Sequence, residues 1–223
     1  DIPALEQQNI AWSNAAGCNA QAVAEYVITA LLHLNMDLLE KNKAFTLAIV
    51  GLGNVGKRLA VMAQLLGWNV IGYDPYVQLA GIENVSFQEL LKQADAISIH
   101  VPLTTSGDYP TLHLFDEAAL AEMKPSAILI NSARGPVIQQ SALMADIEKT
   151  KRQVVLDVFE FEPEIPQELL ERLALATPHI AGYSLEGKAR GTQMIYEAFC
   201  HTFGYQPSKN FESQLPTVEQ YFG

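Results

Sequence analysis

The sequence of 223 residues is poor in cysteine and in positive charge, and each shortage excludes a class of protein. Its two cysteines, Cys18 and Cys200, form no CxxC pair, so neither a disulfide framework nor a metal site is expected, and a cytoplasmic location is favoured. Its 14 lysine and arginine residues are outnumbered by 25 acidic residues, which gives a formal net charge of −11. A chain this acidic is expected to bind neither nucleic acid nor a membrane surface.

Long hydrophobic runs are also scarce. The most apolar stretch, residues 22–34, carries Glu25 and is too short to span a bilayer. Hydrophobic residues still make up 49% of the chain and charged residues 17%, which is enough to bury a sizeable core. The composition therefore predicts a globular protein of one or two domains rather than a disordered chain.

Short apolar runs alternate with helical patterns along most of the chain. The apolar runs are hydrophobic at nearly every position, which is typical of strands covered on both faces in a parallel sheet. The sequence therefore predicts an α/β fold with a doubly wound parallel sheet, the Rossmann-type dinucleotide domain. Strands are predicted at 46–50, 69–73, 96–100, 127–131, 153–158 and 175–177. Helices are predicted at 20–40, 54–66, 87–93, 116–123, 141–149, 167–173 and 187–203, with Asp116 and Ser141 as N-caps.

The first predicted strand is followed by Gly51-Leu-Gly53-Asn-Val-Gly56, a GxGxxG pattern that also opens a predicted helix. In this setting the first glycine permits a tight turn, the second lets the backbone approach a pyrophosphate, and the third lets the helix pack against the strand. The helix N-terminus adds unpaired N–H groups and a partial positive charge. A plain structural turn is the alternative interpretation.

Asp74 ends the second predicted strand, about twenty residues beyond the glycines. A carboxylate there accepts hydrogen bonds from a ribose diol and repels a 2′-phosphate, which favours NAD over NADP. Taken alone, Asp74 is equally consistent with the start of a turn at Pro75. FAD and S-adenosylmethionine remain alternatives, because both bind at similar turns.

The loops after the next two strands add further candidates. Pro102 fixes the chain as it leaves the sheet, and small or apolar groups there suit the wall of a nicotinamide site. His100 is either catalytic or a structural hydrogen-bonding residue, and the structural role is favoured. Arg134 either grips a substrate carboxylate with both arms of its guanidinium or pairs with one of the many acids, and its place at a strand end favours the substrate.

Two later loops carry acidic and basic groups. Asp157 lies within an apolar strand, so it needs a hydrogen-bond donor, and a carboxamide NH₂ would serve. Three glutamates follow it, Glu160, Glu162 and Glu164, and their positions alone do not say which of them is functional. His179 follows the last strand, and a histidine beside a carboxylate can act as general acid and base near neutral pH.

Taken in order, the segments GLGNVG, YDP, HVPLT, NSARG, LDVFEFEP and TPHIAG resemble the NAD-dependent D-2-hydroxyacid dehydrogenase family over about residues 14–192. The resemblance implies an oxidoreductase that uses NAD. It also implies a triad: Arg134 holds the substrate carboxylate, His179 exchanges the C2 hydroxyl proton, and Glu162 orients His179. Asp157 is implied to meet the nicotinamide carboxamide, and Tyr183 to contact substrate together with Arg134. Contacts to NAD are implied at Gly51, Gly53, Asn54, Val55, Gly56, Asp74, Val101, Pro102, Asp157 and Gly182.

Two stretches, DYPTLHLFDE and TPHIAGYSLEGKARGT, resemble one branch of this family. The branch oxidises 4-phospho-D-erythronate to 3-hydroxy-2-oxo-4-phosphooxybutanoate in pyridoxal phosphate (vitamin B6) biosynthesis. Lys188 and Arg190 are candidates to help bind the substrate phosphate. One alternative is a phosphoglycerate-type dehydrogenase of the same family, and the other is an NAD-sensing binding protein without enzymatic activity.

The resemblance also divides the chain. Residues 1–18 are expected to end a substrate domain, residues 19–182 to form the NAD-binding domain, and residues 183–223 to return toward the substrate domain. In the family the substrate domain begins upstream of Asp1, and this branch carries a C-terminal dimerisation domain. We therefore expect these 223 residues alone to bind NAD with little turnover. A homodimer is implied, with the helix near residues 20–40 in its interface.

Overall fold

The computed structural model describes residues 2–39 and 44–216 of the chain. The chain divides into two compact units. One consists of residues 23–181, and the other combines residues 1–22 with residues 182–223.

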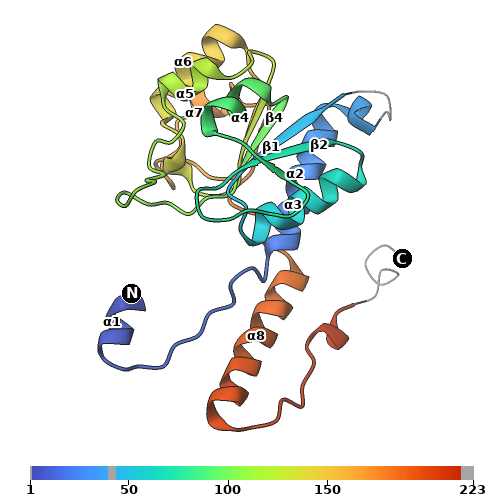
Figure 1. Cartoon of the computed structure of the whole chain (residues 1–223), viewed down its shortest axis with the longest axis vertical. Coiled ribbons are helices and arrows are strands. Elements are labelled where there is room, and N and C mark those ends of the chain that lie inside the picture. The colour runs from blue at the N-terminus through green and yellow to red at the C-terminus, as the bar shows by residue number, and fades with distance from the viewer. Residues whose placement is uncertain (1, 40–43, 217–223) are drawn as a thin grey trace. The chain divides into compact units, whose positions relative to one another are not determined.

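The unit of residues 23–181 is built on a sheet of seven parallel strands (Figure 1). From β1 the chain winds outward in both directions, which gives the order β3-β2-β1-β4-β5-β6-β7 and confirms the predicted doubly wound sheet. The strands are β1 (Thr46–Val50), β2 (Asn69–Tyr73), β3 (Glu83–Asn84), β4 (Ala96–Ile99), β5 (Ile128–Asn131), β6 (Val154–Leu156) and β7 (Leu175–Ala176).

The apolar runs locate the strands well. β1 and β2 begin and end where the sequence predicts them, and the other four predicted strands are one to three residues shorter than predicted. The sequence missed β3, which pairs with β2 at the edge of the sheet through Glu83 and Asn84. Both β3 residues are exposed and polar, so no apolar run marks this strand.

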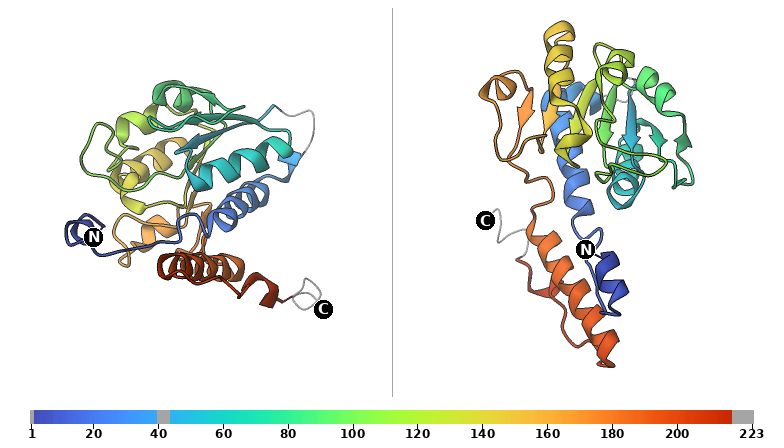
Figure 2. Two further views of the ribbon diagram at one scale, coloured as in Figure 1. Left: turned by 60° about the horizontal axis from the view of Figure 1, so that its bottom comes forward. Right: turned by 90° about the vertical axis from the view of Figure 1, so that its left-hand side faces the viewer.

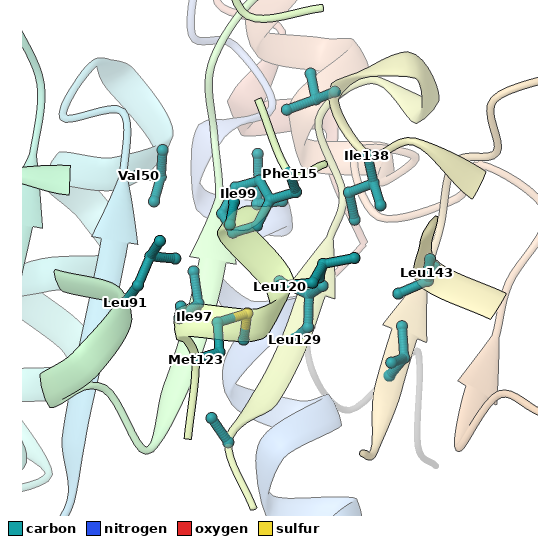
Figure 3. Close-up of a cluster of buried hydrophobic side chains, with 14 of the residues drawn as sticks. Val50, Leu91, Ile97, Ile99, Phe115, Leu120, Met123, Leu129, Ile138 and Leu143 are labelled. Atoms are coloured by element: carbon teal, nitrogen blue, oxygen red, sulfur yellow. The ribbon is translucent and has the colours of Figure 1, made fainter. Parts of the chain in front are cut away.

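Helices cover both faces of the sheet (Figure 2). α2 and α3 pack on one face, and α4, α5, α6 and α7 pack on the other, where their side chains join the cluster drawn in Figure 3. The helices are α2 (Ala20–Leu34), α3 (Asn54–Leu65), α4 (Phe87–Gln93), α5 (Glu117–Glu122), α6 (Gln140–Thr150) and α7 (Gln167–Leu170), and short 3₁₀ turns lie at Met36–Leu39 and Gly135–Val137.

The strand side chains alternate between these two cores. In β1, Leu47 and Ile49 join the cluster under α2 and α3, whereas Ala48 and Val50 join the cluster under α4 to α7. Both sets are fully buried. The central strands are therefore covered on both sides, unlike the edge strand β3, and the carboxyl ends of the strands form an edge lined by loops.

Several helix predictions are wrong in detail, and the helix predicted over 167–173 ends three residues early, at Leu170. The α-helix predicted over 20–40 ends at Leu34, and residue 40 lies outside the described residues. The Asn35 side chain accepts the N–H of Asp37 at 3.1 Å, and this bond offers the backbone an alternative to continuing the helix. Ser141 does not cap α6, since that helix begins one residue earlier and has Gln139 as its N-cap. The predicted cap Asp116 is confirmed, because its side chain accepts the N–H of Ala119 at 2.9 Å.

The other unit contains α1 (Ile2–Gln7), α8 (Leu185–Phe203) and a 3₁₀ turn at Glu212–Gln214. α8 begins two residues before its predicted start, because Ser184 caps it by accepting the N–H of Gly187. It ends at Gly204, whose φ of +71° stops the helix. Among the helices of the described residues, none is long and apolar enough to cross a membrane.

A buried arginine connects the helices α5 and α6 on one face of the sheet. The Arg152 side chain is 1% exposed and pairs with Asp146 of α6, with Nε 2.7 Å from Oδ2. The remaining guanidinium N–H groups donate to the carbonyl oxygens of Leu120, Lys124 and Ala127. This side chain therefore satisfies carbonyl groups in the last turn of α5 and in the segment that leads to β5, and it joins both to α6.

We predict that Arg152→Ala lowers the free energy of unfolding by about 3–5 kcal/mol, because it leaves the Asp146 carboxylate and several carbonyl groups buried without a donor. Urea unfolding followed by circular dichroism measures the change. The control is Arg172→Ala, which removes ion pairs to Glu148 and Glu168 at the surface and should cost much less. Equal losses in the two variants would contradict the structural role given to Arg152.

Candidate cofactor and catalytic site

The glycine-rich turn joins β1 to α3 at the carboxyl edge of the sheet. Gly51 has a φ of +96°, and its N–H donates to the carbonyl of Tyr73 at 2.9 Å. A Cβ at position 56 would lie 2.0 Å from the carbonyl oxygen of Gly51, so the close packing of α3 on the turn requires glycine there. Gly53, the N-cap of α3, has no atom within 4 Å of its Cβ position, which leaves open space beside its backbone.

The first residues of α3 present their amides to this space. Asn54, Val55 and Gly56 form the first turn, so their N–H groups have no carbonyl partner within the helix. The positive end of the helix dipole lies at the same place. The turn therefore combines unpaired helix amides, a favourable dipole and room for an approaching anion.

Asp74 holds the turn after β2 and touches the glycine-rich turn. Its Oδ2 accepts the N–H of Leu52 at 2.8 Å, and its Oδ1 accepts the N–H groups of Tyr76 and Val77 at 2.8 and 2.9 Å. Both interpretations of this residue thus hold together: Asp74 starts a turn, and it lies beside the glycines.

A cavity of about 390 Å³ opens next to Asp74. The predicted residues Gly51, Gly53, Asp74, Val101 and Pro102 all line it. The loop after β4 closes the other side of the cavity through residues to which the sequence analysis gave no role in cofactor binding, among them Asp108 and Tyr109 at the start of the stretch DYPTLHLFDE.

Two exposed tyrosines form an aromatic wall of this cavity. Tyr76 and Tyr109 meet edge to face with ring centroids 5.5 Å apart, and both line the cavity. Aromatic walls suit a flat heterocycle such as adenine. The sequence offered one signal for this wall, the tyrosine directly after Asp74-Pro75. Nothing in the sequence indicated that Tyr76 would meet Tyr109, which lies in a loop 33 positions later.

His100 lies partly buried at the end of β4, with Nε2 2.8 Å from the Ser98 hydroxyl. Burial lowers its pKa to about 3, so the imidazole is neutral in the folded protein at neutral pH. Its backbone carbonyl lies 2.7 Å from the Cβ position of Gly51 and thereby limits that position to glycine. These contacts agree with the structural role favoured for His100.

Arg134 lies exposed in the loop after β5. Its guanidinium donates to the carbonyl of Ala133 at 2.6 Å. Within the described part of the chain it forms no ion pair, so the alternative of a salt bridge to an acid finds no support there. An exposed guanidinium without a carboxylate partner is available to bind an anion.

The structure separates the three glutamates that follow β6. Glu160 is occupied elsewhere, since one carboxylate oxygen lies 2.6 Å from Nε2 of His113 and the other accepts the N–H of Gln140. Glu164 lies exposed, and no contact of its side chain is seen in the described residues. Glu162 has Oε2 at 3.2 Å from Nδ1 of His179, and its Oε1 accepts the N–H of Phe159 at 2.7 Å. Glu162 is thus the one of these three glutamates that contacts His179.

His179 is the partner of Glu162 in this contact. Its side chain is 56% exposed, and its backbone adopts a left-handed φ of +56°. A carboxylate accepts a hydrogen bond from Nδ1–H, which leaves Nε2 as the free basic nitrogen. Glu162 and His179 therefore form a carboxylate–imidazole pair with an accessible imidazole.

Asp157 is 1% exposed, and the chain itself supplies its donors. Oδ1 accepts the hydroxyl of Thr177 at 2.6 Å and the N–H of Ile180 at 2.7 Å, and Oδ2 accepts the N–H of Ala181 at 2.9 Å. The need for a donor is confirmed, and three protein groups fill it. Thr177 could not be predicted as a partner of Asp157, because the two residues belong to different loops 20 positions apart.

Gly182 and Tyr183 belong to the unit of residues 1–22 and 182–223. A Cβ at position 182 would lie 2.2 Å from the amide nitrogen of Asn19, which explains the glycine there. Tyr183 is 72% exposed, and Nζ of Lys188 lies 3.5 Å from the centre of its ring. Tyr183 and Lys188 thus form a cation–π pair at the start of α8.

The residues of the sheet unit fit a dinucleotide. The space beside Gly53 and the amides of α3 suit a pyrophosphate, and the cavity beside Asp74 suits an adenosine. Two carboxylates, Asp74 and Asp108, line that cavity and disfavour a 2′-phosphate. In the described residues, no group of three or more His, Cys, Asp or Glu side chains is placed to hold a metal ion.

The two glycines of the turn should respond differently to a methyl group. We predict that Gly53→Ala leaves stability unchanged within ~0.5 kcal/mol but weakens NAD binding about tenfold, because the methyl occupies the space for the pyrophosphate. Gly56→Ala should instead lower stability by about 3 kcal/mol or more, since its methyl meets a backbone carbonyl. Thermal unfolding and calorimetric titration with NAD measure both effects. A stable Gly56→Ala protein would contradict the packing described.

The neutral state of His100 makes stability depend on pH. The unfolded histidine takes up a proton near its ordinary pKa of about 6.5, whereas the folded one does so only near pH 3, so the folded state loses stability as pH falls below about 6.5. Between about pH 7 and about pH 5.5 this residue should cost about 1.3 kcal/mol. Denaturant unfolding at both pH values, compared with His100→Asn, isolates the effect. An equal pH dependence in the two proteins would refute it.

Comparison with known proteins agrees with this geometry. Residues 32–181 match the family model described as D-isomer specific 2-hydroxyacid dehydrogenase, NAD binding domain. Among solved structures, an acyclic imino acid reductase (Bsp5) in complex with NADPH and D-Arg has 27% identity and a TM-score of 0.79, over 92% of this chain and 72% of that one. The apo D-mandelate dehydrogenase of Rhodotorula graminis has 29% identity and a TM-score of 0.77, over 88% of this chain and 67% of that one.

Curated relatives are more similar in sequence. An erythronate-4-phosphate dehydrogenase of Acinetobacter baumannii is 72% identical over 222 residues, which is 100% of this chain and 62% of that protein. One of Psychrobacter cryohalolentis is 48% identical over 95% of this chain and 60% of that protein. The chain thus spans about three fifths of the length of the relatives it matches. With two thirds of its residues matched by the family model, the chain belongs to the D-isomer specific 2-hydroxyacid dehydrogenase family and carries its NAD-binding domain.

Proposed function

We propose that this chain belongs to an enzyme that oxidises 4-phospho-D-erythronate to 3-hydroxy-2-oxo-4-phosphooxybutanoate with NAD, in the synthesis of pyridoxal phosphate. The observation that carries the proposal is the contact of 3.2 Å between Nδ1 of His179 and Oε2 of Glu162. The name of the curated relatives supplies the substrate. A homodimer, without nucleic-acid or membrane partners, is part of the same proposal.

His179 acts as the base in this proposal. Glu162 accepts the Nδ1–H group, so Nε2 is free to take the proton of the C2 hydroxyl as the C2 hydrogen leaves as a hydride. The imidazolium that forms is stabilised by the same carboxylate. In the reverse direction His179 returns the proton to the C2 oxygen.

Arg134 binds the substrate carboxylate. Its exposed guanidinium follows β5, on the edge of the sheet that also carries the loops after β6 and β7 with Glu162 and His179. Two parallel N–H groups match the two oxygens of a carboxylate and orient C2. The cation also polarises the C2 oxygen.

The cofactor, when bound, supplies the nicotinamide ring that accepts the hydride. Gly51, Gly53 and the first turn of α3 (Asn54, Val55 and Gly56) hold its pyrophosphate, and Asp74 binds its adenosine ribose. Val101 and Pro102 line the same cavity beside Asp74, and the family resemblance implies a further contact of the cofactor with Gly182. Oδ2 of Asp157 accepts one N–H group, so it retains an acceptor site for the nicotinamide carboxamide.

The unit of residues 1–22 and 182–223 belongs to the substrate side of the enzyme in this proposal. Tyr183 contacts the substrate, and the ammonium of Lys188 above its ring provides positive charge for the phosphate, with Arg190 in the same helix. A net charge of −11 makes such local cations necessary for a substrate with a carboxylate and a phosphate.

The test is NADH formation by the chain at enzyme concentrations high enough to detect slow turnover. We expect oxidation of 4-phospho-D-erythronate at least about tenfold faster than that of 3-phosphoglycerate. His179→Gln should lower kcat by about 100-fold or more with NAD affinity within about twofold, because it removes the base and no cofactor contact.

The matched control is His201→Gln, which changes an exposed histidine near the end of α8 and should leave kcat unchanged. A preference for 3-phosphoglycerate would favour the phosphoglycerate-type alternative. The wild-type chain could instead bind NAD tightly and oxidise neither acid. That outcome would count against turnover by these residues alone, and it would favour the NAD-sensing alternative or a requirement for further segments.

A further inference from the structure

A chain of hydroxyl groups links α2 to the turn that carries His179. The hydroxyl of Tyr26 lies 2.6 Å from Oγ1 of Thr177, which in turn donates to Oδ1 of Asp157 at 2.6 Å. The threonine hydroxyl has a single hydrogen and gives it to the carboxylate, so Tyr26 must be the donor in the first contact. The hydrogen bonds therefore run, from donor to acceptor, from Tyr26 to Thr177 and from Thr177 to Asp157.

Asp157 in turn holds the backbone of the turn formed by His179, Ile180 and Ala181. Its carboxylate accepts the N–H groups of Ile180 and Ala181, and its backbone carbonyl accepts the N–H of His179 at 2.9 Å. All three consecutive amides of the turn are thus bonded to one residue. Because the Asp157 side chain is 1% exposed, these hydrogen bonds lie in a region of low dielectric and are strong.

His179 depends on this support. Its left-handed backbone is unfavourable for a residue with a Cβ and persists only where the surroundings hold it. Its exposed imidazole is not fixed by packing, and the 3.2 Å contact to Glu162 is already at the long end of hydrogen bonding. A small shift of the turn is therefore enough to separate the imidazole from its carboxylate.

We infer that Tyr26 is a positioning residue for His179, acting through Thr177 and Asp157. The inference rests on the proposed function for its effect on turnover, and it names a residue of α2 that the motifs leave out. Burial, followed by the negative charge of Asp157, raises the pKa of the Tyr26 hydroxyl against the hydrogen bond to Thr177. The phenol consequently remains protonated and able to donate at neutral pH.

Tyr26→Phe tests the inference, because it removes the hydroxyl and keeps the ring. We expect the amides of Ile180 and Ala181 to exchange with solvent about fivefold faster in the variant, which corresponds to the loss of one hydrogen bond. kcat should fall about tenfold, with KM for NAD within about twofold. In a His179→Gln background the same change should lower kcat no further, since its effect passes through His179.

Conservative variants and a matched control separate positioning from general destabilisation. Thr177→Ser keeps the hydroxyl and should behave as wild type, whereas Thr177→Val should reproduce the effect of Tyr26→Phe. Val27→Ala, one residue along the same buried helix, lowers overall stability but should leave Ile180 and Ala181 protected relative to core amides such as that of Ile49.

The exchange measurement does not require turnover, so failure of the proposed activity and failure of this inference are distinguishable. Unchanged exchange of Ile180 and Ala181 in Tyr26→Phe would overturn the inference even in an active enzyme. A loss of kcat that persists undiminished in the His179→Gln background would also overturn it, because it would show that Tyr26 acts by another route.

Discussion

Covering both faces of a parallel sheet is the constraint on which the rest of this structure depends. Helices must lie on each side, so the chain leaves the strands at the same edge and, except between β2 and β3, returns along a helix. The two buried clusters around Leu47 and Val50 are the direct result. The glycine-rich turn, Arg134, Glu162 and His179 all follow strands, and that shared position brings groups from distant parts of the sequence to one edge.

The strands that carry this arrangement were readable because their central residues are buried and apolar. In β1 and β2 the buried residues 47–50 and 70–72 form such runs, and the ends of both strands were predicted without error. β3 was missed for the opposite reason, since Glu83 and Asn84 are exposed and pair on one side only. Helix ends were harder, because Asn35 ends α2 through a side-chain hydrogen bond that hydrophobic spacing does not register.

The candidate site shows a similar division. Residues whose role follows from the local chain, such as Gly51 and Gly56, were predicted with their reasons. The choice among the three glutamates after β6 needed either the family resemblance or the fold, because it depends on Glu160 meeting His113 from another loop. The sequence analysis assigned no role to Tyr26 or Thr177. Thr177 opens the segment TPHIAG, but nothing in that segment points to Tyr26, whose contact with it spans 151 positions.

Asp74 illustrates how closely recognition and architecture are joined in such a site. The carboxylate that we propose binds the ribose is also the acceptor for the N–H of Leu52, in the middle of the glycine-rich turn, and for two amides of its own turn. Its replacement by a neutral residue to admit a 2′-phosphate would therefore also remove an acceptor that shapes the pyrophosphate cradle. A change of cofactor preference at this position thus carries a conformational cost in the neighbouring loop, and engineering or evolution toward NADP has to restore that acceptor as well as remove the charge.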